Sequence, residues 1–164
     1  MSAIPPKADL LRELRALVET DLAVMTASQE EAQAGATHEE NKAEGDKDMR
    51  STEDSYLARG LAKRVTELRS SVAKLSSLAL REFGEDSAIS LTALVEVEDD
   101  EGRALRYFVA PVGGGIVLNE TGAKVSVVTP LSPLGRALIG RELDDDVVIR
   151  TPHGSKTLSV VGIS

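Results

Sequence analysis

The chain has 164 residues and a formal net charge of -8, with 41% hydrophobic and 28% charged residues, which suits one small domain or two very small ones. It has no cysteine, which excludes disulfide bonds, thiolate zinc sites and a cysteine nucleophile. Its two Phe, two Tyr and absent Trp argue against a base-stacking platform or an aromatic-lined ligand pocket. Because no apolar run is long enough to span a membrane or to form a signal segment, we expect an unprocessed cytoplasmic protein with no membrane partner.

The first part of the chain predicts a long helix over residues 7 to 34. This segment lacks Gly and Pro and follows Pro5 and Pro6, residues that can only precede or open a helix. Apolar or small side chains recur at steps of three and four: Leu11, Leu14, Val18, Leu22 and Met25, continued by Gln29 and Ala32. We expect Gly35 to end the helix, which leaves residues 35–50 as a polar, acidic loop.

A second helix is predicted from about residue 51 to 82, with Ser51 or Thr52 as its N-cap. Its apolar residues form a heptad seam: Leu61, Val65, Leu68, Val72, Leu75 and Ala79. Gly60 inside this helix costs about 1 kcal/mol relative to Ala and suggests a close helix approach or a kink. Neither helix can bury its stripe alone, so we expect an antiparallel hairpin roughly 40 Å long.

After residue 83 the hydrophobic period changes from helical to alternating, which is typical of strands. Residues 88–97 and 104–112 predict a β-hairpin around the acidic turn 98–103. Further short strands are expected near residues 115–118 and 123–128, and two more run to the end of the chain after a short helix that Ser132 caps, Pro133 opens and Gly140 ends. The fold class is therefore α+β, with a mostly antiparallel sheet of about 80 residues following the helices.

Residues 125–154 resemble the C-terminal signature of the Gre family of bacterial transcript cleavage factors. In that family, a Ser-Pro-hydrophobic-x-Arg-x-Leu-Ile-Gly-Lys/Arg run is followed by an acidic pair, a Val/Ile strand and Thr-Pro-x-Gly. The residues that fit it are Ser132, Pro133, Leu134, Arg136, Leu138, Ile139, Gly140, Arg141, Asp145, Val148, Ile149, Thr151, Pro152 and Gly154. The opening Ala3-Ile4-Pro5 is also similar.

The resemblance implies an antiparallel coiled-coil hairpin, residues 1–83, followed by an FKBP-like domain, residues 84–164. It implies a monomeric transcription elongation factor that regulates transcription and carries a DNA-binding role. The factor docks on bacterial RNA polymerase, inserts the hairpin into the secondary channel and stimulates cleavage of backtracked RNA near its 3' end. The chain is then no enzyme by itself and binds no cofactor alone, because its acidic tip shares Mg²⁺ with the polymerase active site, where hard oxygen ligands suit a two-metal reaction.

At the tip, the resemblance implies catalytic carboxylates drawn from Glu40, Glu44, Asp46 and Asp48, with Asp46 and Asp48 as the Mg²⁺ ligands. The family pattern Gly-Asp-x-x-Glu-Asn is present in the opposite order, since Glu40-Asn41 precedes Gly45-Asp46. Tyr56 also lies too far along the second helix, so the first helix is expected to be about one turn short and the tip longer. A solvated acidic loop that binds nothing remains an alternative.

Two further surfaces follow from the same resemblance. The polymerase-docking residues are Ser132, Pro133, Leu134 and Arg136, and a basic patch of Arg59 and Lys63 faces the RNA. The alternative for the basic residues is that they keep the hairpin soluble and pair with acids of the first helix.

Two functions stay open: a cleavage-stimulating factor, favoured by the abundance of tip acids, and a non-cleaving regulator of the same architecture, favoured by the reversed tip order. The missing cysteines exclude a zinc-bearing channel regulator. Prolyl isomerase activity is not expected, because such sites are lined by aromatic side chains and this domain has few.

Overall fold

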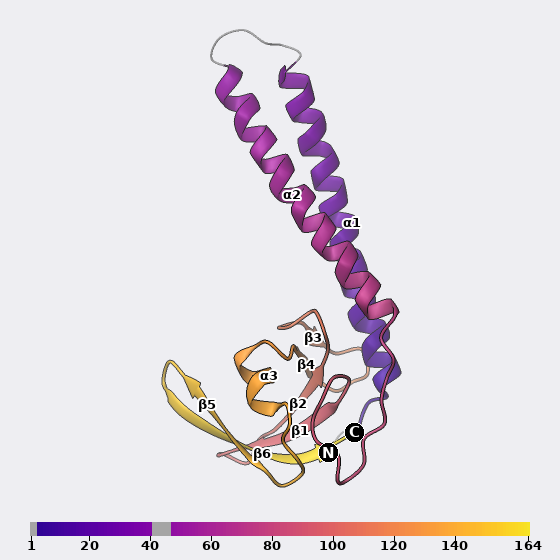
Figure 1. The fold of residues 1–164 in the computed structure, drawn as a ribbon, viewed down its shortest axis with the longest axis vertical. Coiled ribbons are helices and arrows are strands. Elements are labelled where there is room, and N and C mark those ends of the chain that lie inside the picture. Colours follow the sequence, from indigo (N-terminus) through magenta and orange to yellow (C-terminus); the bar gives the residue numbers. More distant parts are fainter. Residues whose placement is uncertain (1–2, 41–46) are drawn as a thin grey trace. The chain divides into compact units, whose positions relative to one another are not determined.

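The computed structural model describes residues 3–40 and 47–164 (Figure 1). The fold is α+β, as predicted: two long helices, α1 (Lys7–Glu40) and α2 (Lys47–Ser76), precede a six-stranded sheet with one short helix, α3 (Pro133–Leu138). The chain divides into two compact units. The helical unit is residues 15–73, and the sheet unit combines residues 1–14 with 74–164.

The helical unit consists of α1 and α2 lying alongside each other (Figure 1). Val18 on α1 and Val65 and Leu68 on α2 are buried. The other predicted stripe positions of this unit are half-buried: Leu22, Met25, Gln29, Ala32, Leu61 and Val72. Because the unit contains no other helix or strand, α1 and α2 cover these side chains, and the predicted positions within the unit are buried or half-buried. Ala79, the last residue of the predicted seam, is instead exposed and lies beyond the end of α2.

The predicted helix ends are wrong. Helix α1 continues through Gly35 to Glu40, and α2 begins at Lys47, so Ser51 and Thr52 lie inside α2 and neither is its N-cap residue. A single exposed Gly costs a helix only about 1 kcal/mol, which the helix-forming residues around it offset. The first helix is therefore longer than expected, and the connection shorter.

Gly60 and the end of α2 also differ from expectation. A Cβ added at Gly60 would meet no atom within 4 Å, so this glycine marks no close helix approach. Helix α2 ends at Ser76 rather than near residue 82. The backbone N–H of Arg81 instead donates to Thr92 Oγ at 3.0 Å, which draws the chain onto the sheet unit.

The sheet has the strand order β3-β4-β2-β1-β6-β5. Its strands are β1 (Leu94–Asp99), β2 (Ala104–Val109), β3 (Val117–Leu118), β4 (Val125–Val128), β5 (Asp146–Thr151) and β6 (Gly154–Ile163). All pairs are antiparallel except β2 with β4, which is parallel. Strand β1 begins at residue 94 instead of 88, because the preceding segment turns at Thr92, whose φ is +74°.

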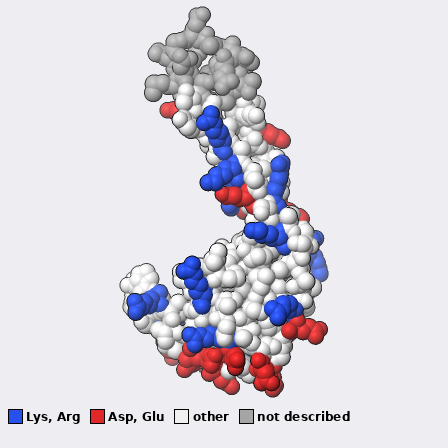
Figure 2. Space-filling model, viewed as in Figure 1, with Lys and Arg blue, Asp and Glu red and all other residues white. Residues whose placement is uncertain are grey.

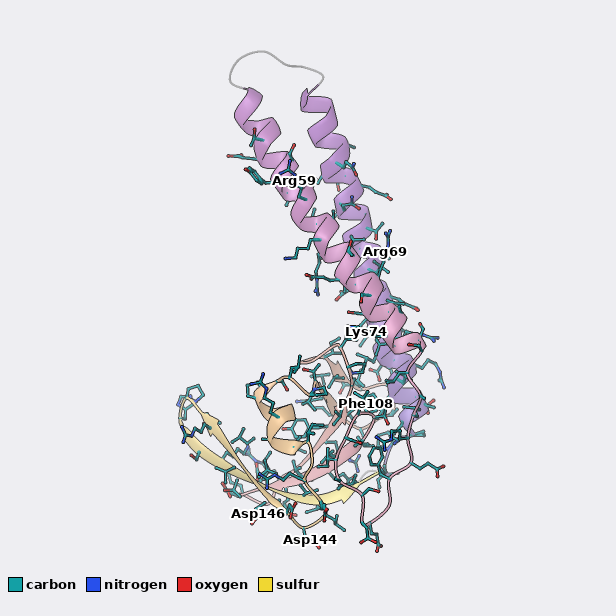
Figure 3. The ribbon with its side chains drawn as sticks, in the orientation of Figure 1. Arg59, Arg69, Lys74, Phe108, Asp144 and Asp146 are labelled. Carbon is teal, nitrogen blue, oxygen red and sulfur yellow. The ribbon has the colours of Figure 1, made fainter. Side chains whose placement is uncertain are left out.

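The core of the sheet unit is aliphatic. Val95, Val97, Leu158 and Val160 form one buried cluster with Leu138 of α3. The largest fully buried side chain is Phe108 on β2 (Figure 3). The sheet unit also includes the first turns of α1, where Leu10 and Leu14 are completely buried.

Candidate functional site

The turn that leads into α3 is tightly specified. Ser132 is the N-cap with φ -68° and ψ 155°, and Pro133 opens the helix, both as predicted. Ser132 Oγ accepts a hydrogen bond from the Gly135 N–H at 3.0 Å and donates one to the Thr129 carbonyl at 2.8 Å. Because Ser132 satisfies the Gly135 N–H and the Thr129 carbonyl within the turn, the neighbouring side chains are free to face outward.

Gly135 is required for this turn. A Cβ added there would lie 1.8 Å from the Thr129 carbonyl oxygen, far inside van der Waals contact. After α3, Gly140 adopts φ +84°, a conformation that favours glycine, and its N–H donates to the Ile89 carbonyl at 2.8 Å. The short helix is therefore held at both ends by backbone geometry.

Some of the predicted docking residues are exposed, and others also pack against the core of the sheet unit. Pro133 and Arg136 are exposed, whereas Leu134 is half-buried and packs against the core cluster. Leu131, which the sequence reasoning missed, is 77% exposed, and Ile139 beyond the helix is 36% exposed. The available signal was the position of Leu131 between Pro130 and Pro133, where a rigid turn can hold a leucine away from the core. Exposed apolar side chains thus lie just before and just after α3.

The basic residues Arg59 and Lys63 lie one turn apart on α2, and both are exposed. The Arg59 guanidinium lies 5.6 Å from the centre of the Tyr56 ring, whose side chain is 65% exposed. Neither cation belongs to an ion pair among the residues that the structure describes, unlike Arg64, which pairs with Glu67 at 3.5 Å. Figure 3 labels Arg59, Arg69 and Lys74 along α2, and Figure 2 shows basic side chains along the helices.

The predicted acidic tip lies at the junction of α1 and α2. Glu40 is the last residue of α1 and Asp48 the second residue of α2, while Glu44 and Asp46 lie outside the described residues. Within the described part of the chain, no group of three or more His, Asp or Glu side chains is arranged to hold a metal ion. The four predicted tip residues offer only carboxylate oxygens, the donor type that Mg²⁺ prefers.

The root of α1 is fixed to the sheet unit by a carboxylate that the sequence reasoning missed. Glu13 is 6% exposed and accepts hydrogen bonds from the N–H groups of Asn119 at 2.8 Å and Glu120 at 3.2 Å. Nearby, Lys7 donates to the Arg81 carbonyl, and burial lowers the pKa of Lys7. The signal in the sequence was an acid placed between Leu10 and Leu14 on an apolar helix face.

The turn between β1 and β2 is built around Asp99, whose side chain is 1% exposed. Its carboxylate accepts the N–H groups of Arg103 and Glu101, each at 2.9 Å, and contacts Arg103 Nε at 2.9 Å and Lys156 Nζ at 3.3 Å. These bonds, led by the Arg103 N–H and opposed by burial, lower the pKa of Asp99 to about 2. The carboxylate has a structural role at the turn.

Among the helices of residues 3–40 and 47–164, none has the length and apolarity needed to cross a membrane. The chain has an α+β fold with a helical unit and, in the sheet unit, a turn before α3 that exposes Leu131. Residues 84–164 match the family described as transcription elongation factor, GreA/GreB, C-terminal. The C-terminal part of the chain, residues 84–164, therefore belongs to the Gre family of transcription elongation factors.

Individual relatives agree with this family. GreB of Pseudomonas aeruginosa is 33% identical over 108 residues, which cover 65% of this chain and 60% of that protein. GreA of Nitratidesulfovibrio vulgaris is 25% identical over 170 residues, covering 100% of this chain and 96% of the relative. Among solved structures, the GreA factor homolog 1 (Gfh1) of Thermus thermophilus is similar at 22% identity and a TM-score of 0.40, covering 92% of this chain and 94% of that one.

Proposed function

We propose that this chain is a cleavage-stimulating elongation factor of bacterial RNA polymerase. The observation that carries the proposal is the match of residues 84–164 to the GreA/GreB C-terminal family. In the proposal, the sheet unit is an FKBP-like docking domain, and α1 and α2 act as an antiparallel coiled-coil hairpin that enters the secondary channel. The chain works as a cytoplasmic monomer and has no complete active site of its own.

The chemistry proposed for the tip is carboxylate positioning. Glu40, Glu44, Asp46 and Asp48 form the pool of ligands, with Asp46 and Asp48 as the residues that share Mg²⁺ with the polymerase. When bound, Mg²⁺ would stabilise the attacking and leaving oxygens of RNA hydrolysis. The chain's own part is to bring negative oxygen ligands to that ion on a helical support, because positioning supplies much of the rate in phosphoryl chemistry.

The surfaces on α2 and around α3 support two partner contacts. Arg59 and Lys63 are exposed on one helix face and suit the phosphates of a displaced RNA 3' end. Around α3, the proposed docking set is Ser132, Pro133, Leu134 and Arg136, to which the 77% exposed Leu131 is added. Ser132 acts by capping the turn, and the exposed neighbours would contact the polymerase.

The test of cleavage uses purified bacterial RNA polymerase halted in backtracked complexes with Mg²⁺. Adding the chain should release short RNA fragments from the 3' end. The triple variant Glu40→Gln, Asp46→Asn, Asp48→Asn should lose this release while keeping its affinity for the polymerase. The matched control is the double variant Glu30→Gln, Glu31→Gln. These two exposed acids lie on α1 before the tip, and their replacement should leave fragment release unchanged.

A second function is favoured by one observation, the reversed order of Glu40-Asn41 and Gly45-Asp46. In this alternative the chain occupies the secondary channel and regulates transcription without chemistry. Binding to the polymerase with no fragment release would support this regulator and overturn the cleavage proposal. Failure to bind the polymerase at all would overturn both.

The docking surface has its own test. Leu131→Ser should weaken the affinity for polymerase roughly tenfold, about 1.4 kcal/mol, without changing the melting temperature. The control is Val148→Ser on β5, since Val148 is also well exposed at 62% but lies outside the α3 turn. Equal affinity of both variants would place the docking surface elsewhere.

A further inference from the structure

A cavity of about 290 Å³ opens at the end of strand β6 in the sheet unit. Phe83, Leu143, Val161 and Ile163 give it apolar walls, and Glu85 adds a carboxylate. None of these residues belongs to the turn around α3 or to the tip. The volume suits one or two side chains of a ligand rather than a whole cofactor.

The cavity lies beside a short open strand edge. On the β5 side, the last hydrogen bonds of β6 are at Val160, whose N–H donates to the Asp145 carbonyl and whose carbonyl accepts the Asp144 N–H, both at 2.9 Å. On the β1 side, Leu94 and Ser164 exchange both backbone bonds at 2.9 Å. Bonded and non-bonded pairs alternate in an antiparallel ladder, so the N–H and carbonyl of Ile163 turn away from β1 toward the open edge.

A bulge widens this edge. The register of β6 on β1 shifts between Gly162, opposite Glu96, and Val160, opposite Val97. Val161 therefore has no partner on β1, and its side chain is 43% exposed beside the cavity. Bulges of this kind interrupt strand pairing locally and redirect a side chain. Here the Val161 side chain offers an apolar contact next to the unpaired backbone groups of Ile163.

The charges around the cavity are mostly acidic. The exposed acids on the two loops that line it are Glu82, Glu85, Asp86, Glu142 and Asp144. Lys7 and Arg81 lie over the ring of Phe83, at 4.7 and 5.8 Å from its centre, and Arg141 Nε is directed to the Ala137 carbonyl of α3 at 3.4 Å. Figure 2 shows acidic side chains gathered at this edge, where Figure 3 labels Asp144.

We propose that the open edge at Val161–Ile163 binds an extended, basic peptide segment of a partner protein as an added strand. The backbone of the segment would pair with Ile163, an apolar side chain would enter the cavity, and flanking Lys or Arg side chains would face Glu85 and Asp144. Main-chain pairing gives such sites their affinity, and pockets with charges give their selectivity. The site is independent of the polymerase contact around α3.

The test is a titration of the ¹⁵N-labelled full chain, followed by amide chemical shifts. The probe is a short capped peptide of alternating lysine and valine. We expect shift changes confined to residues 83–86, 142–145 and 160–164, with a dissociation constant on the order of 1 mM. The same peptide N-methylated at every residue keeps its side chains and charge but offers no backbone N–H for pairing, so it should not bind. A glutamate-for-lysine version should bind at least tenfold more weakly.

Two chain variants complete the design. Val161→Arg should abolish binding of the lysine-valine peptide, whereas Val148→Arg, at a valine that is 62% exposed on β5, should not. The proposal is overturned by shifts centred on α3, by equal binding of the N-methylated peptide, or by no shifts at several times the expected dissociation constant. Concentration-dependent shifts of the same residues without peptide would also overturn it, because a second copy would then be the occupant.

Discussion

The helical unit and the sheet unit are stabilised in different ways. In the helical unit only a narrow seam is buried, with Val18, Val65 and Leu68 at its centre, and an added Cβ at Gly35 or Gly60 meets no atom within 4 Å. In the sheet unit, close contacts and buried polar groups decide the geometry. The helical unit is therefore specified by its hydrophobic periodicity, and the sheet unit by local backbone stereochemistry. A Gly→Ala substitution should for this reason stabilise the helical unit and destabilise the sheet unit.

The largest expected effect is that of Gly135→Ala in the sheet unit. The new Cβ would lie 1.8 Å from the Thr129 carbonyl oxygen, so the turn before α3 must break or shift, at a cost of about 3 kcal/mol or more. Thermal unfolding followed by calorimetry should show a large drop in melting temperature. An unchanged melting temperature would mean that this turn does not hold the sheet unit.

A smaller loss is expected from Glu13→Ala. The change removes the buried carboxylate that accepts hydrogen bonds from the N–H groups of Asn119 and Glu120. Because bonds to a charged group are among the stronger ones, the free energy of unfolding should fall by about 1 to 3 kcal/mol in urea titrations. Glu19→Ala is the control, because Glu19 is exposed and pairs with Arg15 at 3.6 Å, an interaction that contributes little. Equal losses in the two variants would show that Glu13 fixes nothing.

The Asp99 turn should give the sheet unit a distinct pH dependence. The pKa of Asp99 is about 2 against an ordinary 3.8, so its contribution to stability is complete above about pH 4 and is lost as the pH falls toward 2. Asp99→Asn should flatten this part of the acid unfolding curve, measured by circular dichroism. Asp86→Asn, at an exposed acid, should leave the curve unchanged; matching curves for the two variants would contradict the assignment.

The smallest effect, and one of opposite sign, is expected in the helical unit. Gly35→Ala and Gly60→Ala should each stabilise it by about 0.5 to 1 kcal/mol and raise the helical signal, since both sites have room for a methyl group. Gly154→Ala, at φ +124° in the sheet unit, should destabilise instead. A destabilising change at Gly60 would reveal a contact on that face of α2.

The sequence predicted what local chemistry determines. Sequence alone was enough to predict the apolar stripes, the Ser132 cap and Pro133 at the start of α3, because these features depend on residues only a few positions apart. The ends of α1 and α2 were not, since one glycine penalises a helix too weakly to stop it. The role of Glu13 could not be predicted because its partners Asn119 and Glu120 lie more than a hundred residues away.

The candidate site was predictable in part for a similar reason. The turn before α3, which we propose as the docking surface, follows a contiguous motif, whereas the exposure of Leu131 depends on how that turn packs. The choice among Glu40, Glu44, Asp46 and Asp48 stays a prediction, since the reversed order of the two short motifs leaves more than one alignment. The parallel pairing of β2 with β4 could not be predicted either, because it depends on tertiary packing and the periodicity of a strand does not indicate its partner.

The most direct test of the central proposal measures where the chain meets the polymerase metal ion. Replacing the catalytic Mg²⁺ by Fe²⁺ in a backtracked complex generates hydroxyl radicals that cut nearby backbone. We expect cuts in the bound chain between residues 36 and 52 and none in residues 84–164. Cuts confined to the sheet unit, or an uncut chain that is nevertheless bound, would contradict it.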